Sequence, residues 1–276
     1  MHIVADTSTL YSPAEGKEKG ITIIPACSIV EGNTYRDYED INSEEFLHFI
    51  EDGKVPTTSQ PAVGDVLDVL ESIDDEILYL SIGDGLSGAY QTAMGARNCV
   101  ENKEKIHIID TKTLAGPHRY MLEKAMRLKE KGHKIDEIIK SLMKSVDSSI
   151  SFVIPSDFEF LKRSGRLTPI AAKIGAAIKI VPVMTQTEDK RRIEPFVIKR
   201  TKKRAVEAIV NRLESLGAGA EHLISIGHAG VREQAQAVME QMRERLKNVE
   251  FEILELPPTL ITHGGPGCIT IQMVEK

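Results

Sequence analysis

Apolar residues along the first half of the chain form short strand-like runs that alternate with amphipathic helical stretches. The clearest helical stretch follows Pro61, where Val63, Val66, Leu70 and Ile73 recur with the spacing of one helix face. Strands are expected over residues 2–5, 21–27, 77–82, 106–109 and 150–154, and further helices over about 43–51, 118–131 and 135–148. Strands that alternate with helices predict a mostly parallel sheet with helices on both faces.

The second half of the chain has a different pattern. Charged residues 189–192 separate two apolar runs, which predicts a hairpin. The other expected elements are a small-residue helix over 170–177, helices from about 201 and over 231–247, and strands over 180–186, 193–198, 223–226, 251–256 and 269–274. We therefore expect two domains, an N-terminal α/β domain over 1–155 and a C-terminal α/β domain with a mixed sheet over 156–276.

The stretch from 79 to 93 combines a strand, a glycine turn and a helix. Its apolar run breaks at Gly83 and Gly85, and helical residues resume after Ser87. The Ser87 hydroxyl and the Gly88 amide would then lie in the first helical turn, where unpaired N–H groups and the helix dipole favour an anion. A serine that caps an ordinary strand-to-helix turn explains the same residues equally well. This stretch alone leaves both interpretations open.

Polar residues also follow other expected strands. Residues Asp6 to Ser8 come after the first strand, and Asp110 and Thr111 come after the strand over 106–109. Because ligands of parallel α/β sheets bind beyond the carboxyl ends of the strands, we expect these residues and the 83–87 loop to share one rim.

Composition narrows the choice of partners and cofactors. The chain has 35 basic and 41 acidic residues, a net charge of −6 that argues against nucleic acid as the main partner. The three cysteines form no CxxC pair and the eight histidines show no ligand spacing, so we expect reduced thiols, no metal and a cytoplasmic protein. No GxGxxG follows the first strand, which argues against a dinucleotide-binding enzyme. No leader peptide is expected. Lysines interrupt the most apolar window, 170–184, which is too short to span a membrane.

Five segments together resemble the DegV family of lipid-binding proteins. They are Asp6-Thr7-Ser8, Thr58-Ser59-Gln60-Pro61, Leu86-Ser87-Gly88-Ala89-Tyr90-Gln91, Phe160-Leu161-Lys162-Arg163-Ser164-Gly165-Arg166-Leu167 and His263-Gly264-Gly265-Pro266-Gly267. Each segment alone is a weak signal, but their order and spacing extend over essentially the whole chain.

The resemblance implies a non-catalytic carrier that holds a long-chain fatty acid between two domains. Hydroxyl groups, a histidine and an arginine would grip the carboxylate, and no cofactor is implied besides the bound fatty acid. The residues implied for this role are Thr58, Ser59, Ser87, Gly88, Arg166 and His263. In bacteria some relatives present the fatty acid to a separate kinase, which phosphorylates the carboxylate. The tunnel for the acyl chain would have apolar walls, with Ile170, Ile174 and Ile178 as candidates.

The chain departs from the family pattern beside the expected carboxylate site. It has Gly83-Asp84-Gly85 where relatives usually carry small hydroxyl residues, Ala89 in place of a threonine, and an added glycine in the last motif. Asp84 matters most, because a carboxylate that points at the ligand would repel it unless Asp84 faces solvent or the ligand is protonated.

Other interpretations stay open at this point. Thr58 and Ser59 also suit a capping pair before the Pro61 helix. Gly85 to Ala89 nearly matches the nucleophile elbow of serine hydrolases, and Ser87, Asp110 or Asp157, and His263 follow the order of that catalytic triad. Such enzymes normally form one large domain, which favours the carrier.

A basic run at the start of the helix expected from about 201 suggests a partner. Arg200, Lys202 and Lys203 lie where positive charge is unfavourable for the helix dipole. We therefore expect them to dock an acidic or phosphate-bearing partner such as the kinase. His228, at the end of an expected strand, is a peripheral candidate. A regulatory module that senses lipid through the basic run is a third alternative.

Overall fold

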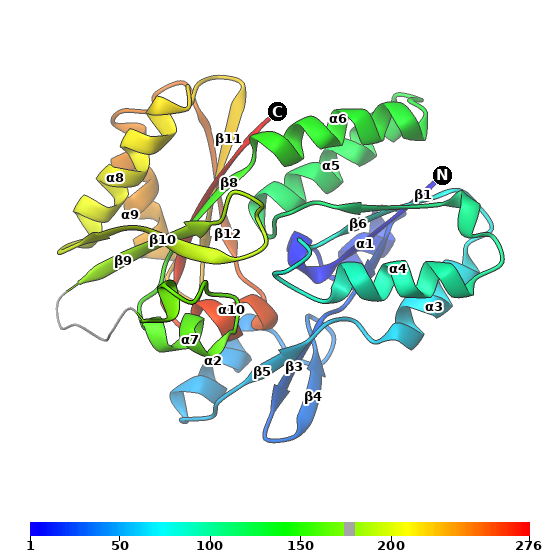
Figure 1. Cartoon of the computed structure of the whole chain (residues 1–276), viewed down its shortest axis with the longest axis horizontal. Helices are drawn as coiled ribbons and strands as arrows, with labels where there is room; N and C mark the ends of the chain where they lie inside the picture. Colours follow the sequence, from blue (N-terminus) through cyan, green and yellow to red (C-terminus); the bar gives the residue numbers. More distant parts are fainter. Residues whose placement is uncertain (174–179) are drawn as a thin grey trace.

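The protein has two lobes, each built on its own β-sheet (Figure 1). A computed structural model describes residues 1–173 and 180–276. The N-terminal lobe contains a four-stranded parallel sheet in the order β2-β1-β6-β7. Its strands are β1 (His2–Asp6), β2 (Thr22–Ile24), β6 (Ile77–Ser81) and β7 (Ile106–Asp110).

Helices cover both faces of this parallel sheet, as the alternating pattern predicted. The covering helices are α1 (Pro13–Glu18), α3 (Val63–Ser72), α4 (Ala89–Cys99), α5 (Gly116–Glu130) and α6 (Ile135–Ser148). On β6, Leu78 and Leu80 pack with residues of α5 and α6, while Ile77 and Tyr79 pack with residues of α3 and α4. Successive side chains thus enter opposite hydrophobic cores, as the period of a strand requires.

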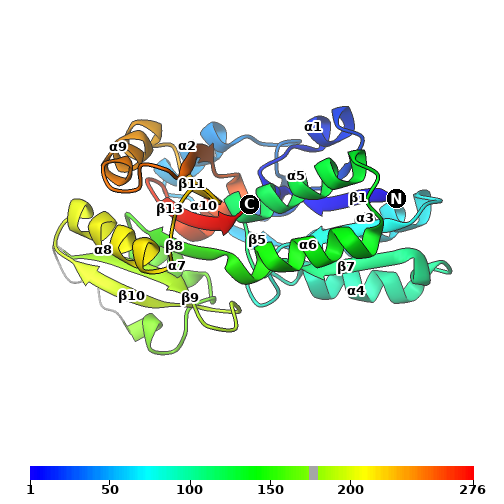
Figure 2. The same ribbon diagram turned by 90° about the horizontal axis from the view of Figure 1, so that it is seen from above.

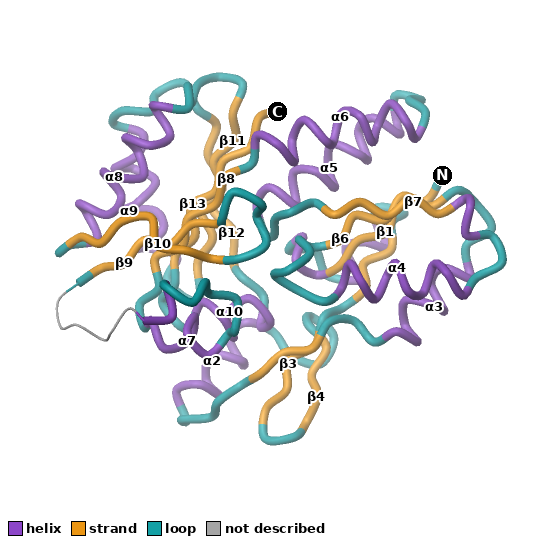
Figure 3. The backbone as a smooth tube through the Cα atoms, in the orientation of Figure 1, coloured by secondary structure: helices purple, strands orange, loops and turns teal. Residues whose placement is uncertain are grey.

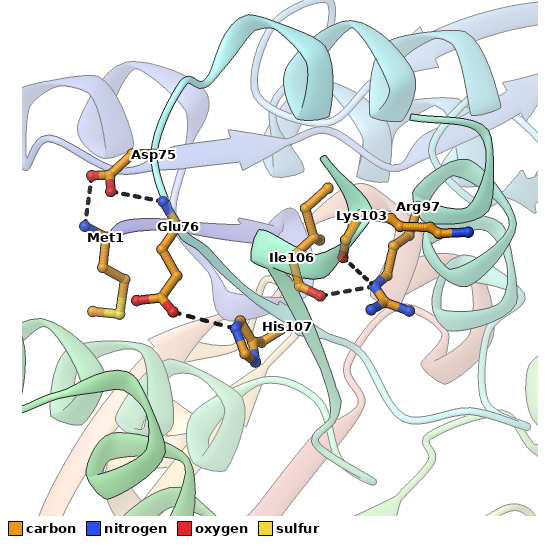
Figure 4. Close-up of polar contacts among 7 residues, drawn as sticks. All are labelled: Met1, Asp75, Glu76, Arg97, Lys103, Ile106 and His107. Atoms are coloured by element: carbon orange, nitrogen blue, oxygen red, sulfur yellow. Dashed lines mark hydrogen bonds and ion pairs between the residues drawn. The ribbon is translucent and has the colours of Figure 1, made fainter. Parts of the chain in front are cut away.

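Short polar contacts close the end of the parallel sheet where its strands begin (Figure 4). The amino group of Met1 lies 2.6 Å from Asp75, and the carboxylate of Glu76 lies 3.4 Å from the ring of His107. Arg97 Nε donates to the backbone carbonyls of Lys103, before β7, and Ile106, its first residue, at 3.0 and 2.8 Å. These contacts fasten the start of β7 to α4 and to the neighbouring strand.

The C-terminal lobe is built on a mixed six-stranded sheet in the order β10-β9-β8-β13-β11-β12. Its strands are β8 (Ile150–Ile154), β9 (Val181–Gln186), β10 (Ile193–Lys199), β11 (His222–His228), β12 (Glu250–Glu255) and β13 (Ile269–Glu275). Helices α8 (Lys202–Ser215) and α9 (Arg232–Arg243) cover its outer face. Along β13, Ile269 and Ile271 face these helices, whereas Thr270 and Gln272 face the other way, toward the N-terminal lobe.

Two helices and a small sheet join the lobes. Helices α5 and α6 run from the parallel sheet to β13 (Figure 2). On another side, a three-stranded sheet in the order β4-β3-β5 lies near the junction (Figure 3). The elements of this region are β3 (Cys27–Val30), β4 (Asn33–Arg36), β5 (Thr57–Ser59), α2 (Ser43–Glu51), α7 (Phe158–Arg163) and α10 (Pro258–Gly264). Short 3-10 helices cover Thr7–Thr9, Lys103–Lys105 and Ala171–Lys173.

Some predicted elements differ from the observed ones. The expected strand over 21–27 is two strands, β2 and β3, which belong to different sheets and meet near Pro25, a residue without a backbone N–H. Of the helix expected over 170–177, residues 171–173 form a 3-10 helix, and residues 174–177 lie outside the described residues. Strand β8 precedes residue 155 but pairs with β13 and β9, so we propose that the domain boundary falls between α6 and β8.

Candidate functional site

The ends of the parallel strands form one polar rim, as expected. Asp6, at the end of β1, accepts hydrogen bonds from the backbone N–H groups of Ser8 at 2.9 Å and Ile82 at 3.0 Å. Asp110, at the end of β7, accepts the N–H of Asp84 at 3.0 Å. The two carboxylates fix the loops after β1 and β6 in place, because each buried N–H group needs a partner.

A cavity extends from this rim between the two lobes. The volume of this cavity is about 150 Å³. Apolar side chains of both lobes contribute to its wall, among them Ile82, Leu86, Leu114, Val153, Met184 and Leu256. The exposed surface of the wall is mostly apolar, with a smaller polar share, so the space suits an apolar molecule that carries a small polar group.

Thr58 and His263 meet at one place in the cavity wall although they are far apart in the sequence. Thr58 lies on β5 and pairs with Ser28 of β3, and its Oγ1 is 2.9 Å from Nε2 of His263, on α10. The capping interpretation of Thr58 and Ser59 is wrong, because both lie in β5 and the N-cap of α3 is Ala62, which has no side-chain cap.

The imidazole of His263 is neutral near neutral pH. Burial lowers the pKa of His263 to about 3, and the positive charge of Arg166 adds to this lowering. His263 therefore acts as a hydrogen-bonding group in the free protein and not as a cation.

Ser87 and Gly88 stand at the start of α4, beside the strand that carries Thr58. The Ser87 Oγ accepts the N–H of Ala89 at 3.2 Å, while Gly88 is the N-cap. Within the described residues no acceptor takes the hydroxyl hydrogen of Ser87, so this hydroxyl accepts from the first helical turn and can still donate to a ligand. A Cβ on Gly88 would lie 3.1 Å from the side-chain amide of Gln60, which shows how closely the two segments approach.

Arg166 joins the two lobes at the same end of the cavity. Its Nε donates to the backbone carbonyl of Leu86 at 2.9 Å, and its guanidinium also donates to the carbonyl of Ser164. Burial lowers the pKa of Arg166 below its ordinary value. A partly buried guanidinium with a face toward an apolar cavity favours a bound anion.

Asp84 points away from the cavity, toward the turn between β9 and β10. Its Oδ2 lies 2.7 Å from the guanidinium of Arg191 and 3.2 Å from Nε2 of Gln91. The adjacent Gly85 has a φ of +90°, and a Cβ there would lie 2.6 Å from the carbonyl oxygen of Arg191. The unusual Gly83-Asp84-Gly85 sequence thus serves a contact between the lobes, in which the Asp84 carboxylate is paired with Arg191.

The structure does not assemble the serine hydrolase triad. Asp157 caps α7 by accepting the N–H of Glu159, and Asp110 accepts backbone N–H groups of the rim. Across residues 1–173 and 180–276, no hydrogen bond joins Ser87 to His263 or His263 to a carboxylate. The serine is therefore not activated in the way that such enzymes require.

The basic run lies at the start of α8, and its residues do not line the cavity. Thr201 caps the helix by accepting the N–H of Arg204. Lys202 Nζ donates to Gln234 at 2.6 Å, and burial lowers its pKa. Arg200 and Lys203 are exposed. Docking of a partner there stays a prediction.

The expected tunnel residues find no support. Ile170 is 76% exposed and does not line this cavity, and Ile174 and Ile178 are outside the described residues. His228 is 3% exposed, and neither of its ring nitrogens has a hydrogen-bond partner among the described residues. It does not line the cavity, so it stays outside the candidate site.

Sequence reasoning missed a buried carboxyl group behind the cavity wall. Asp37 accepts the hydroxyls of Thr7, at 3.1 Å, and of Thr259, and the backbone N–H of Thr259 at 3.2 Å. Burial raises the pKa of Asp37 to about 7. In the sequence Asp37 stands in a run of charged residues that is typical of a surface loop, so nothing local marked it.

Replacing Asp37 by asparagine is expected to change how the stability depends on pH. The pKa of Asp37 is raised from 3.8 to about 7 on folding, so its contribution to stability is present below the lower value and is lost as pH rises through the higher one. Between about pH 5 and about pH 8 the original protein should therefore lose more stability than the variant. Urea unfolding at both pH values measures this; an equal change in the two proteins would contradict it.

The described residues contain neither an evident metal site nor a membrane-spanning helix. No group of three or more histidine, cysteine, aspartate or glutamate side chains there is placed to hold a metal ion. None of the described helices combines the length and the apolar character that crossing a membrane requires.

Fold and site together define a two-lobed α/β protein with a largely apolar cavity between the lobes. The model of the family described as "Uncharacterised protein, DegV family" matches residues 1–276, so the chain belongs to the DegV family. The DegV domain-containing protein SA1258 of Staphylococcus aureus is 28% identical over 278 residues, which cover 99% of this chain and 98% of that protein.

Two solved structures are similar over the whole chain. DegV from Bacillus subtilis, described as a fatty acid binding protein, has a TM-score of 0.86 and 26% identity, with 100% of this chain and 99% of that chain covered. A DegV family protein from Thermus thermophilus, whose description concerns fatty acid binding, has a TM-score of 0.88, 26% identity and the same coverage.

Proposed function

We propose that this protein binds a long-chain fatty acid, with the acyl chain in the cavity and the carboxylate at Thr58, Ser87, Arg166 and His263. The observation that carries the proposal is that hydrogen-bond donors and a guanidinium from four distant segments line one largely apolar cavity. The description of the Bacillus subtilis relative as a fatty acid binding protein supports it. The role is that of a non-catalytic carrier.

The acyl chain provides most of the binding free energy. Burial of apolar surface is worth about 0.8 kcal/mol per methylene, so ~16 carbons contribute roughly 12 kcal/mol before the costs of ordering the ligand. The head group contributes selectivity, because a carboxylate moved out of water loses several kcal/mol unless donors replace its hydration.

The carboxylate site has donors to offer. The Ser87 oxygen accepts the N–H of Ala89, and among the described residues nothing accepts its hydroxyl hydrogen, which can therefore be donated to a ligand. In the tautomer with the proton on Nε2, His263 donates to Thr58 Oγ1, which leaves the Thr58 hydroxyl to donate to the ligand. Arg166 adds positive charge, and Ser59 also lines the cavity, whereas Gly88 is the N-cap of α4 and is not among the lining residues.

Protein purified from cells should carry fatty acid. Native mass spectrometry is expected to show an extra mass that organic extraction removes, and gas chromatography of the extract should identify an acyl chain. The extracted protein should bind added palmitate again. Protein that purifies without ligand and does not bind palmitate would overturn the proposal.

Removing a hydroxyl from the carboxylate site should weaken binding of fatty acids selectively. For Ser87→Ala and Thr58→Val we expect about a tenfold to hundredfold loss for palmitate, because a hydrogen bond to a charged group is worth ~1.5–3 kcal/mol. Binding of hexadecanol, which has no charge, should weaken much less. Thr57→Val, on the exposed face of the same strand, is the matched control. Equal losses for acid and alcohol would show that the hydroxyls do not bind the carboxylate.

We further propose that this protein works in the cytoplasm and presents its fatty acid to a fatty acid kinase that docks on Arg200, Lys202 and Lys203. The exposure of Arg200 and Lys203 supports this assignment. The double variant Arg200→Glu, Lys203→Glu should keep its affinity for palmitate but slow phosphorylation of the bound ligand by the kinase. Lys129→Glu, an exposed change on the other lobe, is the control. Unchanged kinase coupling in the double variant would refute the docking site.

A further inference from the structure

A second set of polar side chains lines the same cavity. Asp6 and Ser8, at the end of β1, and Thr259, on α10, contribute to its wall. All three are almost completely buried, with exposed fractions of 1%, 4% and 6%. We call them the acceptor cluster, because their hydrogen bonds determine which atoms they can offer to a ligand.

Ser8 offers the cavity an oxygen and not a hydrogen. Its Oγ lies 2.8 Å from Nδ1 of His118, and Nε2 of that fully buried ring lies 3.2 Å from the carbonyl oxygen of Leu80. A carbonyl only accepts, so the ring carries its proton on Nε2, and burial keeps the imidazole neutral by lowering its pKa. Nδ1 is then an acceptor, and the Ser8 hydroxyl hydrogen points to it.

The other two members of the cluster are also acceptors. The Thr259 hydroxyl donates to Oδ2 of Asp37, which can only accept once it is ionised, at pH values above its pKa of about 7. The Asp6 carboxylate accepts two backbone N–H groups and has no hydrogen to give. Lone pairs of all three groups therefore remain for a donor.

The three groups lie close to one another and close to the carboxylate site. Thr7, between Asp6 and Ser8 in the chain, donates to the same Asp37 carboxylate as Thr259 and so joins the two segments. Thr259 precedes His263 by four residues on α10, which places their Cβ atoms about 5–6 Å apart on one helix face. The cluster thus flanks the ligand about one helical turn from its carboxylate.

We propose that the acceptor cluster recognises a hydroxyl group on the first few carbons of the acyl chain, so that the preferred ligands are 2- or 3-hydroxy fatty acids. This inference depends on the proposed function, because the carboxylate must lie at Thr58 and His263 for the hydroxyl to reach the cluster. The hydroxyl hydrogen is the donor that the cluster lacks. A second carboxylate at this place is excluded by the charge of Asp6.

The test compares the dissociation constants of palmitate, 3-hydroxypalmitate and 16-hydroxypalmitate at about pH 8, where Asp37 is ionised. The original protein should bind 3-hydroxypalmitate about tenfold more tightly than palmitate, as expected for one added hydrogen bond near a charged group. 16-Hydroxypalmitate, with its hydroxyl at the far end, should show no such gain. Ser8→Ala and Thr259→Val should each reduce the ratio between 3-hydroxypalmitate and palmitate to about twofold or less.

Ser225→Ala is the matched control, since Ser225 is equally buried but donates to Glu252 outside the cavity. Its ratio should equal that of the original protein. Palmitate binding without a preference for the 3-hydroxy acid would overturn this inference and leave the proposed function intact. A preference that persists in both cluster variants would also overturn it, and binding of neither acid would overturn both proposals. If Ser8→Ala does not fold, Thr259→Val alone decides.

Discussion

Replacing Arg166 by glutamine is expected to weaken fatty acid binding about a hundredfold, within the ~1.5–3 kcal/mol range of a charge-assisted hydrogen bond. Arg166 is the only cation that we assign to the carboxylate site, and its guanidinium lies in the cavity wall while it donates to the Leu86 carbonyl beside Ser87. Arg166→Lys should recover only part of the loss, because an ammonium cannot reproduce the planar fork that contacts the Leu86 and Ser164 carbonyls.

The neighbouring Arg163 offers a close control. It is the last residue of α7 and is exposed, with its guanidinium 4.6 Å from the centre of the Phe160 ring. Arg163→Gln removes an equal charge outside the cavity and should leave the dissociation constant of palmitate within about twofold. Titration calorimetry on delipidated protein compares the variants. Similar losses for Arg163→Gln and Arg166→Gln would show that only the net charge matters.

Replacing Gly116 by alanine is expected to reduce the free energy of unfolding by about 3 kcal/mol, at the upper end of the usual cost of overpacking. Gly116 begins α5, where a Cβ would lie 2.1 Å from the Cβ of Ser225 on β11. The Gly116 N–H also donates to Gln272 at 3.2 Å, so the helix cannot move away without losing this contact between the lobes. Urea unfolding followed by circular dichroism measures the loss.

Ser225→Gly should partly rescue Gly116→Ala, because it removes the atom with which the new methyl group collides. Gly95→Ala is the contrasting control: Gly95 lies inside α4 with nothing within 4 Å of an added Cβ. That change should stabilise the protein by about 0.5–1 kcal/mol, since alanine loses less backbone entropy in a helix. A loss of stability in Gly95→Ala, or none in Gly116→Ala, would contradict the packing argument.

The fold was predictable from the sequence where local pattern and tertiary environment agree. Strand β6, its glycine turn and α4 were visible because an apolar run, two glycines and helical residues follow one another. Helix α10 was not, because its sequence before Gly264 reads as a loop and its burial comes from packing against α2 and α7. The strand expected over 21–27 failed because an apolar run cannot show that its halves join different sheets.

The site was predictable mainly through the family resemblance. That resemblance pointed to Thr58 and His263, and the structure places them in contact, but their role toward a fatty acid stays a proposal. The partner of Asp84 could not be predicted, since Arg191 follows it by 107 residues and no local spacing connects them. The same holds for Asp37, whose hydroxyl partners Thr7 and Thr259 come from opposite ends of the chain.

The contact of Asp84 and Gly85 with Arg191 has a consequence for the exchange of ligand. The turn between β9 and β10 belongs to the C-terminal lobe but presses its backbone against a glycine of the other lobe. If the lobes separate on this side to release a long acyl chain, the ion pair between Asp84 and Arg191 has to break. The Arg191 side chain is about half exposed to solvent, so salt screens this pair. Raised salt should therefore weaken the contact and speed any exchange that requires the lobes to separate.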